Sequence, residues 1–158
     1  MKKNTTVLIL PDIRSAVNVG SMFRTADACG VSFIYLAGIT PAPLDQFKRP
    51  NSDIAKSALG AEKTIPWKAV KNLRPLITKL KKDGYQIIAI EQSEHSVDYK
   101  KVRPADKVAF IVGNEVEGVP QKIQNLCDVI AEIPMRGEKE SLNVSVALGV
   151  ALSRMLSI

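Results

Sequence analysis

Short apolar runs alternate along this chain with longer amphipathic stretches. The apolar runs predict strands at 7–10, 32–37, 86–90, 107–112 and 129–133. The stretches between them carry apolar residues at helical spacing and predict helices at 18–29, 52–59, 68–83, 119–126 and 141–156. Strands that alternate with helices are typical of an α/β fold with a mostly parallel sheet flanked by helices. The run VAFIV at 108–112 has no polar position, so we expect its strand to be buried on both faces.

Capping residues and helix breakers refine these boundaries. Asn18 is a good N-cap for the first helix, and Gly30 is typical of the residue that ends one. The three prolines between 38 and 50 predict a loop. Pro75 falls inside the helical pattern at 68–83, so it should kink this helix or split it in two.

The last predicted helix has an unusual composition. Ser145, Gly149 and Ser153 recur every four residues and leave one nearly bare stripe, while the other sides are apolar. A glycine inside a helix costs about 1 kcal/mol relative to alanine, and close packing against another helix would offset that cost. We therefore expect this helix to be buried on nearly all sides, and a subunit interface is one natural way to bury it.

Length and composition narrow the class of protein. The 158 residues fit one domain, and no stretch approaches the roughly 20 apolar residues that a membrane span requires. The N-terminal segment MKKNTTVLIL places two lysines before an apolar run, but this run ends at Pro11 and no small-residue cleavage site follows. We therefore expect a cytoplasmic protein rather than a secreted one.

Charge and rare side chains limit the chemistry. The formal charge of +6 favours polyanionic partners without requiring them. The chain has one Trp, three Tyr and four Phe, so base stacking on an aromatic platform is not the expected way to bind nucleic acid. Cys29 and Cys127 are isolated and His95 is the only histidine, so we expect no metal site. His95 lies in a polar stretch and is expected in a solvated loop.

Three segments associated with strands are rich in Gly, Asn, Ser and charge. They read NVGSMFRTADACGV at 18–31, IVGNEVEGVP at 111–120 and IPMRGEKESLNVSVALG at 133–149. Ligands of open α/β sheets bind outside the carboxyl ends of strands, where glycines let them approach the backbone. Asn18 and Gly20 also place a capping amide and a close backbone approach at a helix N-terminus, which suits an anion. Taken singly, each segment equally fits a capped helix, a strand–turn–helix connection or a helix start. GxGxxG and Walker A motifs are absent.

Taken together, in this order and spacing, the three segments resemble the motifs of the SpoU (TrmH-like) RNA 2′-O-methyltransferases of the SPOUT superfamily. The resemblance runs from about Asp12 to Leu156. It implies a sheet whose C-terminal segment forms a deep trefoil knot, and a homodimer whose active site draws on both subunits. It also implies S-adenosylmethionine as cofactor and methylation of a ribose 2′-hydroxyl of tRNA or rRNA. We favour tRNA, because no part of the sequence looks like a separate rRNA-binding domain. We expect one SpoU-type methyltransferase domain over residues 1–158, without extension domains.

The resemblance also implies site residues. The family's catalytic positions are occupied by Asn18, Arg24, Glu115, Ser141 and Asn143. The cofactor would be held, largely by backbone, around Ile90, Glu91, Gly113, Ile133, Ser141 and Leu142. The cationic candidates for RNA binding are Arg24 and, in loops near the site, Lys48, Arg49, Lys56, Arg136 and Lys139. The chain departs from the family's sequence pattern at Ala151-Leu152-Ser153-Arg154, where many relatives carry a tyrosine–glutamate pair.

The role of Arg24 has two interpretations. The family proposal is that this arginine activates the ribose hydroxyl, yet a guanidinium stays protonated in essentially all proteins. In the alternative, Arg24 grips a phosphate and orients the hydroxyl, while Glu115 holds Arg24 or a water and Asn143 fixes the ribose. Two other functions remain open at this point: a small Rossmann-like nucleotide-binding enzyme, and a non-catalytic RNA-binding or dimerisation module on the same fold.

Overall fold

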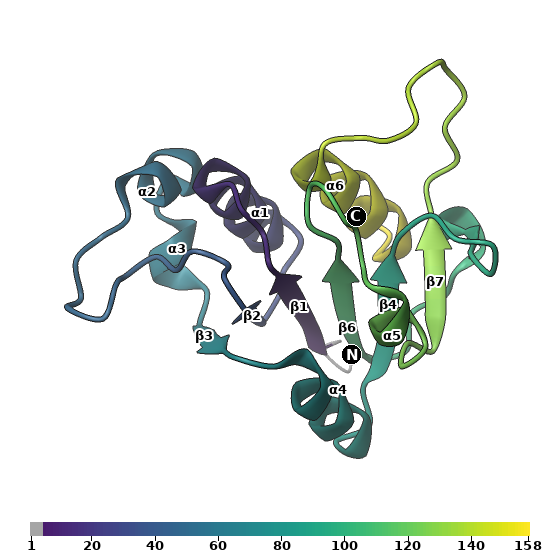
Figure 1. The fold of residues 1–158 in the computed structure, drawn as a ribbon, viewed down its shortest axis with the longest axis horizontal. Helices are drawn as coiled ribbons and strands as arrows, with labels where there is room; N and C mark the ends of the chain where they lie inside the picture. Colours follow the sequence, from purple (N-terminus) through teal and green to yellow (C-terminus); the bar gives the residue numbers. More distant parts are fainter. Residues whose placement is uncertain (1–4) are drawn as a thin grey trace.

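A parallel β-sheet forms the centre of the molecule (Figure 1). The computed structural model describes residues 5–158, so the two N-terminal lysines lie outside the described part. Within that part, seven strands lie in the order β3-β2-β1-β6-β4-β7-β5, and all paired strands are parallel. The strands are β1 (Thr5–Pro11), β2 (Phe33–Ala37), β3 (Trp67–Val70), β4 (Gln86–Ile90), β5 (Val97–Asp98), β6 (Lys107–Val112) and β7 (Val129–Glu132).

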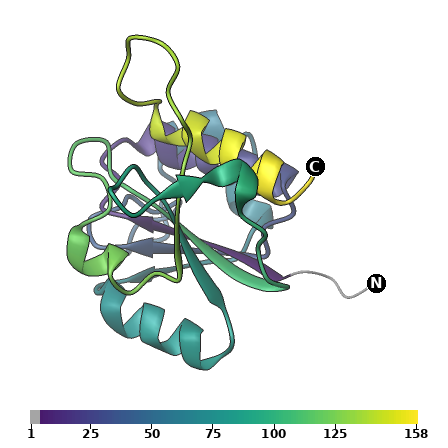
Figure 2. The ribbon, with the colours of Figure 1, turned by 90° about the vertical axis from the view of Figure 1, so that its right-hand side faces the viewer.

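Helices cover both faces of the sheet (Figure 2). One face carries α1 (Ala16–Ala28), α2 (Ser52–Ala58), α3 (Ala61–Thr64), the 3₁₀ helix η1 (Tyr99–Lys101) and α6 (Val144–Met155). The other face carries α4 (Leu73–Lys82) and α5 (Gln121–Gln124). In β6, Phe110 packs on the first face and Ile111 on the second, and both are 0% exposed. No helix in residues 5–158 is long and apolar enough to cross a membrane.

The predicted α/β class and parallel sheet are confirmed, but the prediction for 68–83 is wrong in part. The segment divides into the edge strand β3 and the helix α4, whose N-cap is Asn72. Pro75 therefore lies in the first turn of α4, where a backbone N–H has no intrahelical acceptor to lose. It neither kinks nor splits a longer helix. The short elements α3, β5 and η1 were not predicted.

The N-terminus of α1 differs from the prediction. Ser15, not Asn18, is the N-cap, and its hydroxyl accepts a hydrogen bond from the Asn18 N–H at 3.1 Å. Gly20 serves the crossing of α1 over α2, because a Cβ there would lie 2.6 Å from the carbonyl oxygen of Ile54. The close approach at Gly20 is therefore made by another helix and not by an anion.

Helix α6 packs on α1 and on the sheet, but not on all sides. Leu148 and Leu152 are 0% exposed, and the nearest atom to a Cβ at Gly149 would be Thr25 Cγ2 at 3.8 Å. Val146 and Val150 are 50% and 38% exposed. The expectation of burial on nearly all sides is wrong for a single chain, since the side that carries these two valines faces away from the core.

Candidate active site

A cavity of about 610 Å³ lies at the carboxyl ends of β4, β6 and β7, against the N-terminal turn of α6. Its wall combines apolar side chains with backbone and carboxylate groups. The lining comprises Ile90 to Gln92, Gly113 to Val119, Gln124, Ile133, Met135, Ser141 to Val144 and Ala147. Its size falls within the range of about 300–1,000 Å³ of small-molecule sites.

The loop after β6 forms one wall and is closed by its own backbone. Gly113 and Gly118 touch, so that a Cβ at Gly113 would lie 2.5 Å from Gly118 Cα. Gly118 has a φ of +66°, which favours glycine. The Asn114 side-chain oxygen accepts hydrogen bonds from the N–H groups of Val116 and Glu117, at 2.9 and 2.6 Å. The glycines predicted to admit a ligand thus also permit the tight turn that shapes the cavity.

Glu91 ties the loop after β4 to this turn. Its carboxylate accepts hydrogen bonds from the Val119 N–H and from the Gln92 N–H, both at 2.8 Å. The Gln92 side chain in turn donates to the carbonyl oxygen of Glu140 at 2.8 Å. The loop after β4 is therefore joined to both of the other loops that line the cavity.

A hydrogen-bonded chain connects the predicted catalytic groups at one end of the cavity. The Glu115 carboxylate accepts from the N–H groups of Arg14 and Ser15 and from the Asn18 amide, each at 3.1 Å. The Asn143 amide donates to the Asn18 side-chain oxygen at 3.3 Å. Partial burial raises the pKa of Glu115, but these hydrogen bonds outweigh it, so the pKa lies below its usual value. Glu115 is thus a carboxylate at neutral pH.

The predicted residues divide into two groups by position. All six residues expected around the cofactor lie in the cavity lining, as do Glu115, Ser141 and Asn143. Asn18 joins them through its hydrogen bonds. Arg24 is exposed on α1 and is not among the lining residues. The cationic candidates Lys48, Arg49, Lys56, Arg136 and Lys139 are all exposed and lie outside the lining.

Gln124 lines the cavity and was not anticipated. It is 9% exposed, and its amide donates to the Val119 carbonyl oxygen at 2.8 Å. Its side-chain oxygen is buried without a hydrogen-bond donor from the described residues. Such an atom normally finds a partner, so it marks a place for a donor from outside the chain. Its position on a four-residue helix carries no sequence signal of this kind.

The remaining reactive side chains lie outside this arrangement. Burial, and secondarily the carboxylate of Asp128, raises the pKa of the Cys127 thiol to about 11. Burial also raises the pKa of Cys29. Both thiols are therefore protonated and poorly nucleophilic at neutral pH. His95 is exposed in a loop, in agreement with the expectation.

The fold and cavity define an open-sheet α/β protein with a candidate small-molecule site at the carboxyl edge of its strands. The chain belongs to the SpoU rRNA Methylase family, whose model matches residues 5–153. The family resemblance of the three motifs is therefore confirmed.

Several known proteins are similar over this region. The 23S rRNA (guanosine-2′-O-)-methyltransferase RlmB of Neisseria meningitidis serogroup B is 38% identical over 147 residues, which are 93% of this chain and 56% of the relative. The crystal structure of an AdoMet-bound rRNA methyltransferase from Sinorhizobium meliloti has a TM-score of 0.86 and 29% identity, over 97% of this chain and 56% of that one. The A. aeolicus TrmH/SpoU tRNA modifying enzyme has a TM-score of 0.84 and 28% identity, over 99% and 76%. The chain spans about half the length of the curated relatives it matches.

Proposed function

We propose that this protein transfers a methyl group from S-adenosylmethionine to a ribose 2′-hydroxyl of structured RNA. The observation that carries the proposal is the hydrogen-bonded chain from Glu115 through Asn18 to Asn143 at the edge of the cavity. It joins one residue from each of the three family motifs beside a space of small-molecule size. The names of the similar proteins supply the reaction class.

The cavity fits this cofactor by three properties. Apolar walls at Ile90 and Ile133 suit an adenine ring, and the orphan oxygen of Gln124 can accept a hydrogen bond from an amine. The carboxylates of Glu91 and Glu115 favour a cation. When bound, S-adenosylmethionine supplies a methyl group already activated by a positive sulfur, so positioning is what the chain must contribute.

The chain's own residues can provide that positioning. Glu115 is fixed by three donors, so it holds the Asn18 amide in one orientation. Asn18 then orients Asn143, whose side-chain oxygen caps α6 by accepting from the Ser145 N–H at 2.9 Å. This leaves Arg24 to contact RNA phosphate and ribose through the N–H donors of its guanidinium group.

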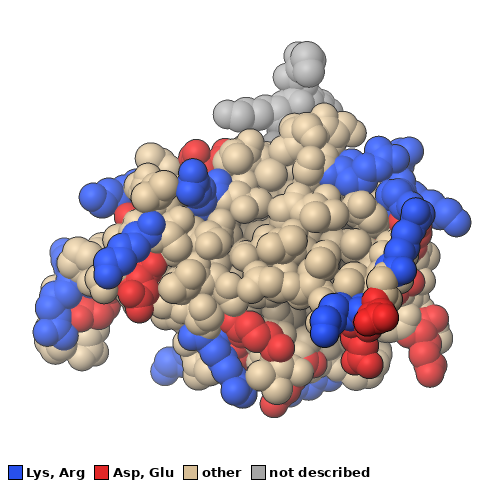
Figure 3. Space-filling model, turned by 90° about the horizontal axis from the view of Figure 1, so that it is seen from above, with Lys and Arg blue, Asp and Glu red and all other residues tan. Residues whose placement is uncertain are grey.

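We further propose that the protein works as a homodimer that shares its active sites. Val17, Val146 and Val150, on α1 and α6, are 53%, 50% and 38% exposed. Figure 3, viewed over these helices, shows a broad uncharged area with charged side chains around its rim. A second copy would cover this apolar face. It would also explain why Arg24 lies on exposed α1 away from the cavity of its own chain: the cavity it completes belongs to the partner.

The resemblance extends the proposal to the fold and setting. We propose that the segment between β7 and α6 passes through a loop as a trefoil knot, supported by its hydrogen bond to Gln92 in the loop after β4. Residues 1–158 then form one methyltransferase domain, which acts in the cytoplasm. Transfer RNA is the substrate that we favour, with ribosomal RNA as the comparison.

Two measurements test this function. Titration calorimetry with S-adenosylmethionine should show saturable binding, and tritiated methyl groups should then appear in tRNA or rRNA. Arg24→Ala should abolish transfer while the melting temperature and cofactor affinity stay unchanged. Unchanged activity of Arg24→Ala would contradict the assignment. A folded protein that binds RNA but no cofactor at millimolar concentration would favour the non-catalytic RNA-binding module.

A pair of variants, each expected to lose methyl transfer because it lacks a proposed active-site group, tests the shared site. If Arg24 serves the partner's cavity, a heterodimer of Arg24→Ala and Glu115→Gln chains contains one intact site. Co-expressed and tandem-purified heterodimers should then recover up to about half of the wild-type rate. If both residues served the same cavity, each site would carry one defect and the heterodimer would be as inactive as its parents. Light scattering of Val146→Glu, expected to be monomeric, checks the interface itself.

A further inference from the structure

The loop between β2 and α2 presents the one exposed aromatic side chain of residues 5–158. Phe47 is 68% exposed, whereas every other aromatic side chain in this part of the chain is buried or half-buried. A single exposed apolar residue is ordinary on a protein surface. What distinguishes Phe47 is the structure that holds it in place.

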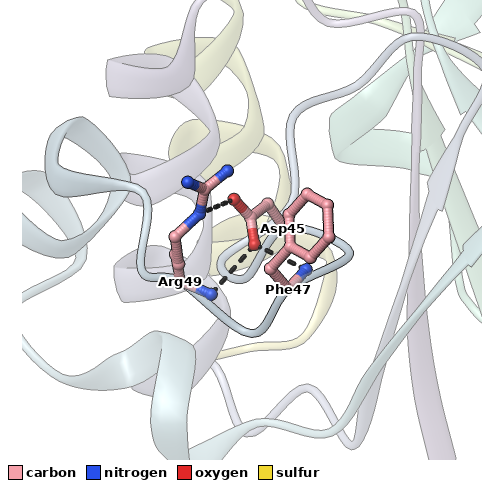
Figure 4. Close-up of polar contacts among 3 residues, drawn as sticks. All are labelled: Asp45, Phe47 and Arg49. Atoms are coloured by element: carbon pink, nitrogen blue, oxygen red, sulfur yellow. Dashed lines mark hydrogen bonds and ion pairs between the residues drawn. The ribbon is translucent and has the colours of Figure 1, made fainter.

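Asp45 organises the tip of this loop (Figure 4). One oxygen of its carboxylate accepts the N–H groups of Phe47 and Arg49, at 2.8 and 2.9 Å. The other oxygen accepts the side-chain Nε–H of Arg49 at 2.7 Å. The Asp45 N–H also donates to the Arg49 carbonyl oxygen at 3.0 Å, and Lys48 has a φ of +60°. The aromatic ring is therefore presented by a preorganised turn, so little conformational entropy is lost when it binds.

Arg49 and Phe47 form a cation–π pair. The Arg49 guanidinium carbon lies 5.0 Å from the centre of the Phe47 ring, within the range of cation–π contacts. Phe47 is 68% exposed despite this contact, so we infer that the ring face that Arg49 does not cover is accessible to solvent. An open ring face that is backed by a fixed cation, with the exposed Lys48 beside it, has the composition of a base-stacking platform.

The base of this loop is connected to the candidate active site. The loop leaves the carboxyl end of β2, which is two strands from β6 and therefore roughly 10 Å from the end of β6. The Asp12 carboxylate accepts the Ile39 N–H, and the Thr40 hydroxyl accepts the Ile13 N–H, both at 3.0 Å. The two residues that follow Ile13 donate their N–H groups to Glu115. The same short segment thus fixes both the loop and the predicted catalytic carboxylate.

We propose that Phe47, backed by Arg49, stacks on an unpaired base of the RNA substrate, while Lys48 contacts an adjacent phosphate. This inference rests on the proposed function and specifies how the substrate is gripped. RNA is favoured over a protein partner because the turn at 45–49 carries two cations against the single carboxylate of Asp45, and so keeps a net positive charge beside the ring, whereas the core of a protein interface is depleted of charge. The low aromatic content argued against stacking, but a single preorganised ring can supply it.

The test compares the binding of short fluorescein-labelled oligoadenylate and of an RNA duplex of equal length. Phe47→Ala should weaken oligoadenylate binding by about 5- to 150-fold, the factor that corresponds to one lost base stack. The salt dependence of oligoadenylate binding by Phe47→Ala, and the affinity of this variant for the duplex, should stay unchanged. Phe47→Trp should retain binding, and Phe47→Leu, which is apolar but has no flat ring, should not. Lys48→Ala should instead reduce the salt slope by about 0.7.

Three results would overturn the inference. Equal oligoadenylate affinity of Phe47→Ala and wild type would remove the stack, and full binding by Phe47→Leu would indicate a simple apolar contact. If Phe47→Ala changes the mass of the assembly measured by light scattering but leaves RNA affinity unchanged, the loop belongs to a protein interface. All variants should keep wild-type melting temperatures and cofactor affinity. If the wild type binds and methylates RNA, any of these three results overturns only the proposed role of the loop at 45–49. If the wild type does not bind RNA, the proposed function is overturned as well.

Discussion

Substitution of Gly113 by alanine should damage the cavity without touching a charged or reactive group. A Cβ at this position would lie 2.5 Å from two backbone atoms of Gly118, and ordinary contact begins near 3.4 Å, so the turn must open by about 0.9 Å. Backbone atoms cannot rotate away as a side chain can. Overpacking of this kind typically costs about 1–3 kcal/mol. Opening the turn also strains the hydrogen bond from the Val119 N–H to Glu91, which measures 2.8 Å.

For a cost of about 2 kcal/mol, the melting temperature should fall by roughly 4–8 °C in a chain of this size. Because the displaced turn lines the cavity, affinity for S-adenosylmethionine should fall at least tenfold, which corresponds to about 1.4 kcal/mol. Thermal unfolding and titration calorimetry measure the two effects. Gly137→Ala is the matched control, since a Cβ there meets nothing within 4 Å. Unchanged stability and affinity in Gly113→Ala, or equal losses in both variants, would refute the reasoning.

Three further outcomes follow from the contacts described. Glu115→Gln places an amide donor against N–H donors and should lower the free energy of unfolding by about 1 kcal/mol at pH 7. The folded-state pKa of Glu115 is lowered, so its carboxylate stabilises the fold only at pH values where it is ionised. Urea denaturation should therefore show the full difference between Glu115→Gln and wild type above the unfolded-state pKa, and this difference should disappear as the pH falls through the folded-state pKa. A difference that does not change with pH would contradict this. Burial, and secondarily the carboxylate of Asp128, raises the pKa of the Cys127 thiol to about 11. The wild type should therefore lose stability relative to Cys127→Ala as the pH rises from about 9 to about 11. Plots of unfolding free energy against pH that run parallel for the two proteins would contradict this. Gly20→Ala should lower the melting temperature despite the better helix propensity of alanine, because its Cβ would lie 2.6 Å from the Ile54 carbonyl oxygen; an increase would show that α1 and α2 can separate freely.

Two errors in the predicted element boundaries have identifiable physical causes. Trp67–Val70 is an edge strand of four residues, too short for its alternation to stand out from the helical pattern that follows. Asn18 and Ser15 are both good capping residues, and composition alone does not choose between them. The choice depends on Glu115, which engages the Asn18 amide and leaves the Ser15 hydroxyl to cap α1.

The sequence by itself determined the order of the main elements, the parallel sheet and the family. Alternation of apolar runs with amphipathic stretches is a local property, and so are the three motifs. The run VAFIV, for example, can be buried on both faces only in a sheet with two covering layers, which is where β6 lies.

Only the tertiary structure decided which of the motif residues meet. Asn18 and Glu115 are 97 positions apart and Asn18 and Asn143 are 125 apart, yet hydrogen bonds join them because the carboxyl ends of parallel strands share one edge of the sheet. The same geometry leaves Arg24 on the exposed side of α1 and holds Phe47 open to solvent on a turn built by Asp45. Neither outcome is contained in spacing along the chain, because which side of an element stays exposed depends on the neighbours that the fold places against it.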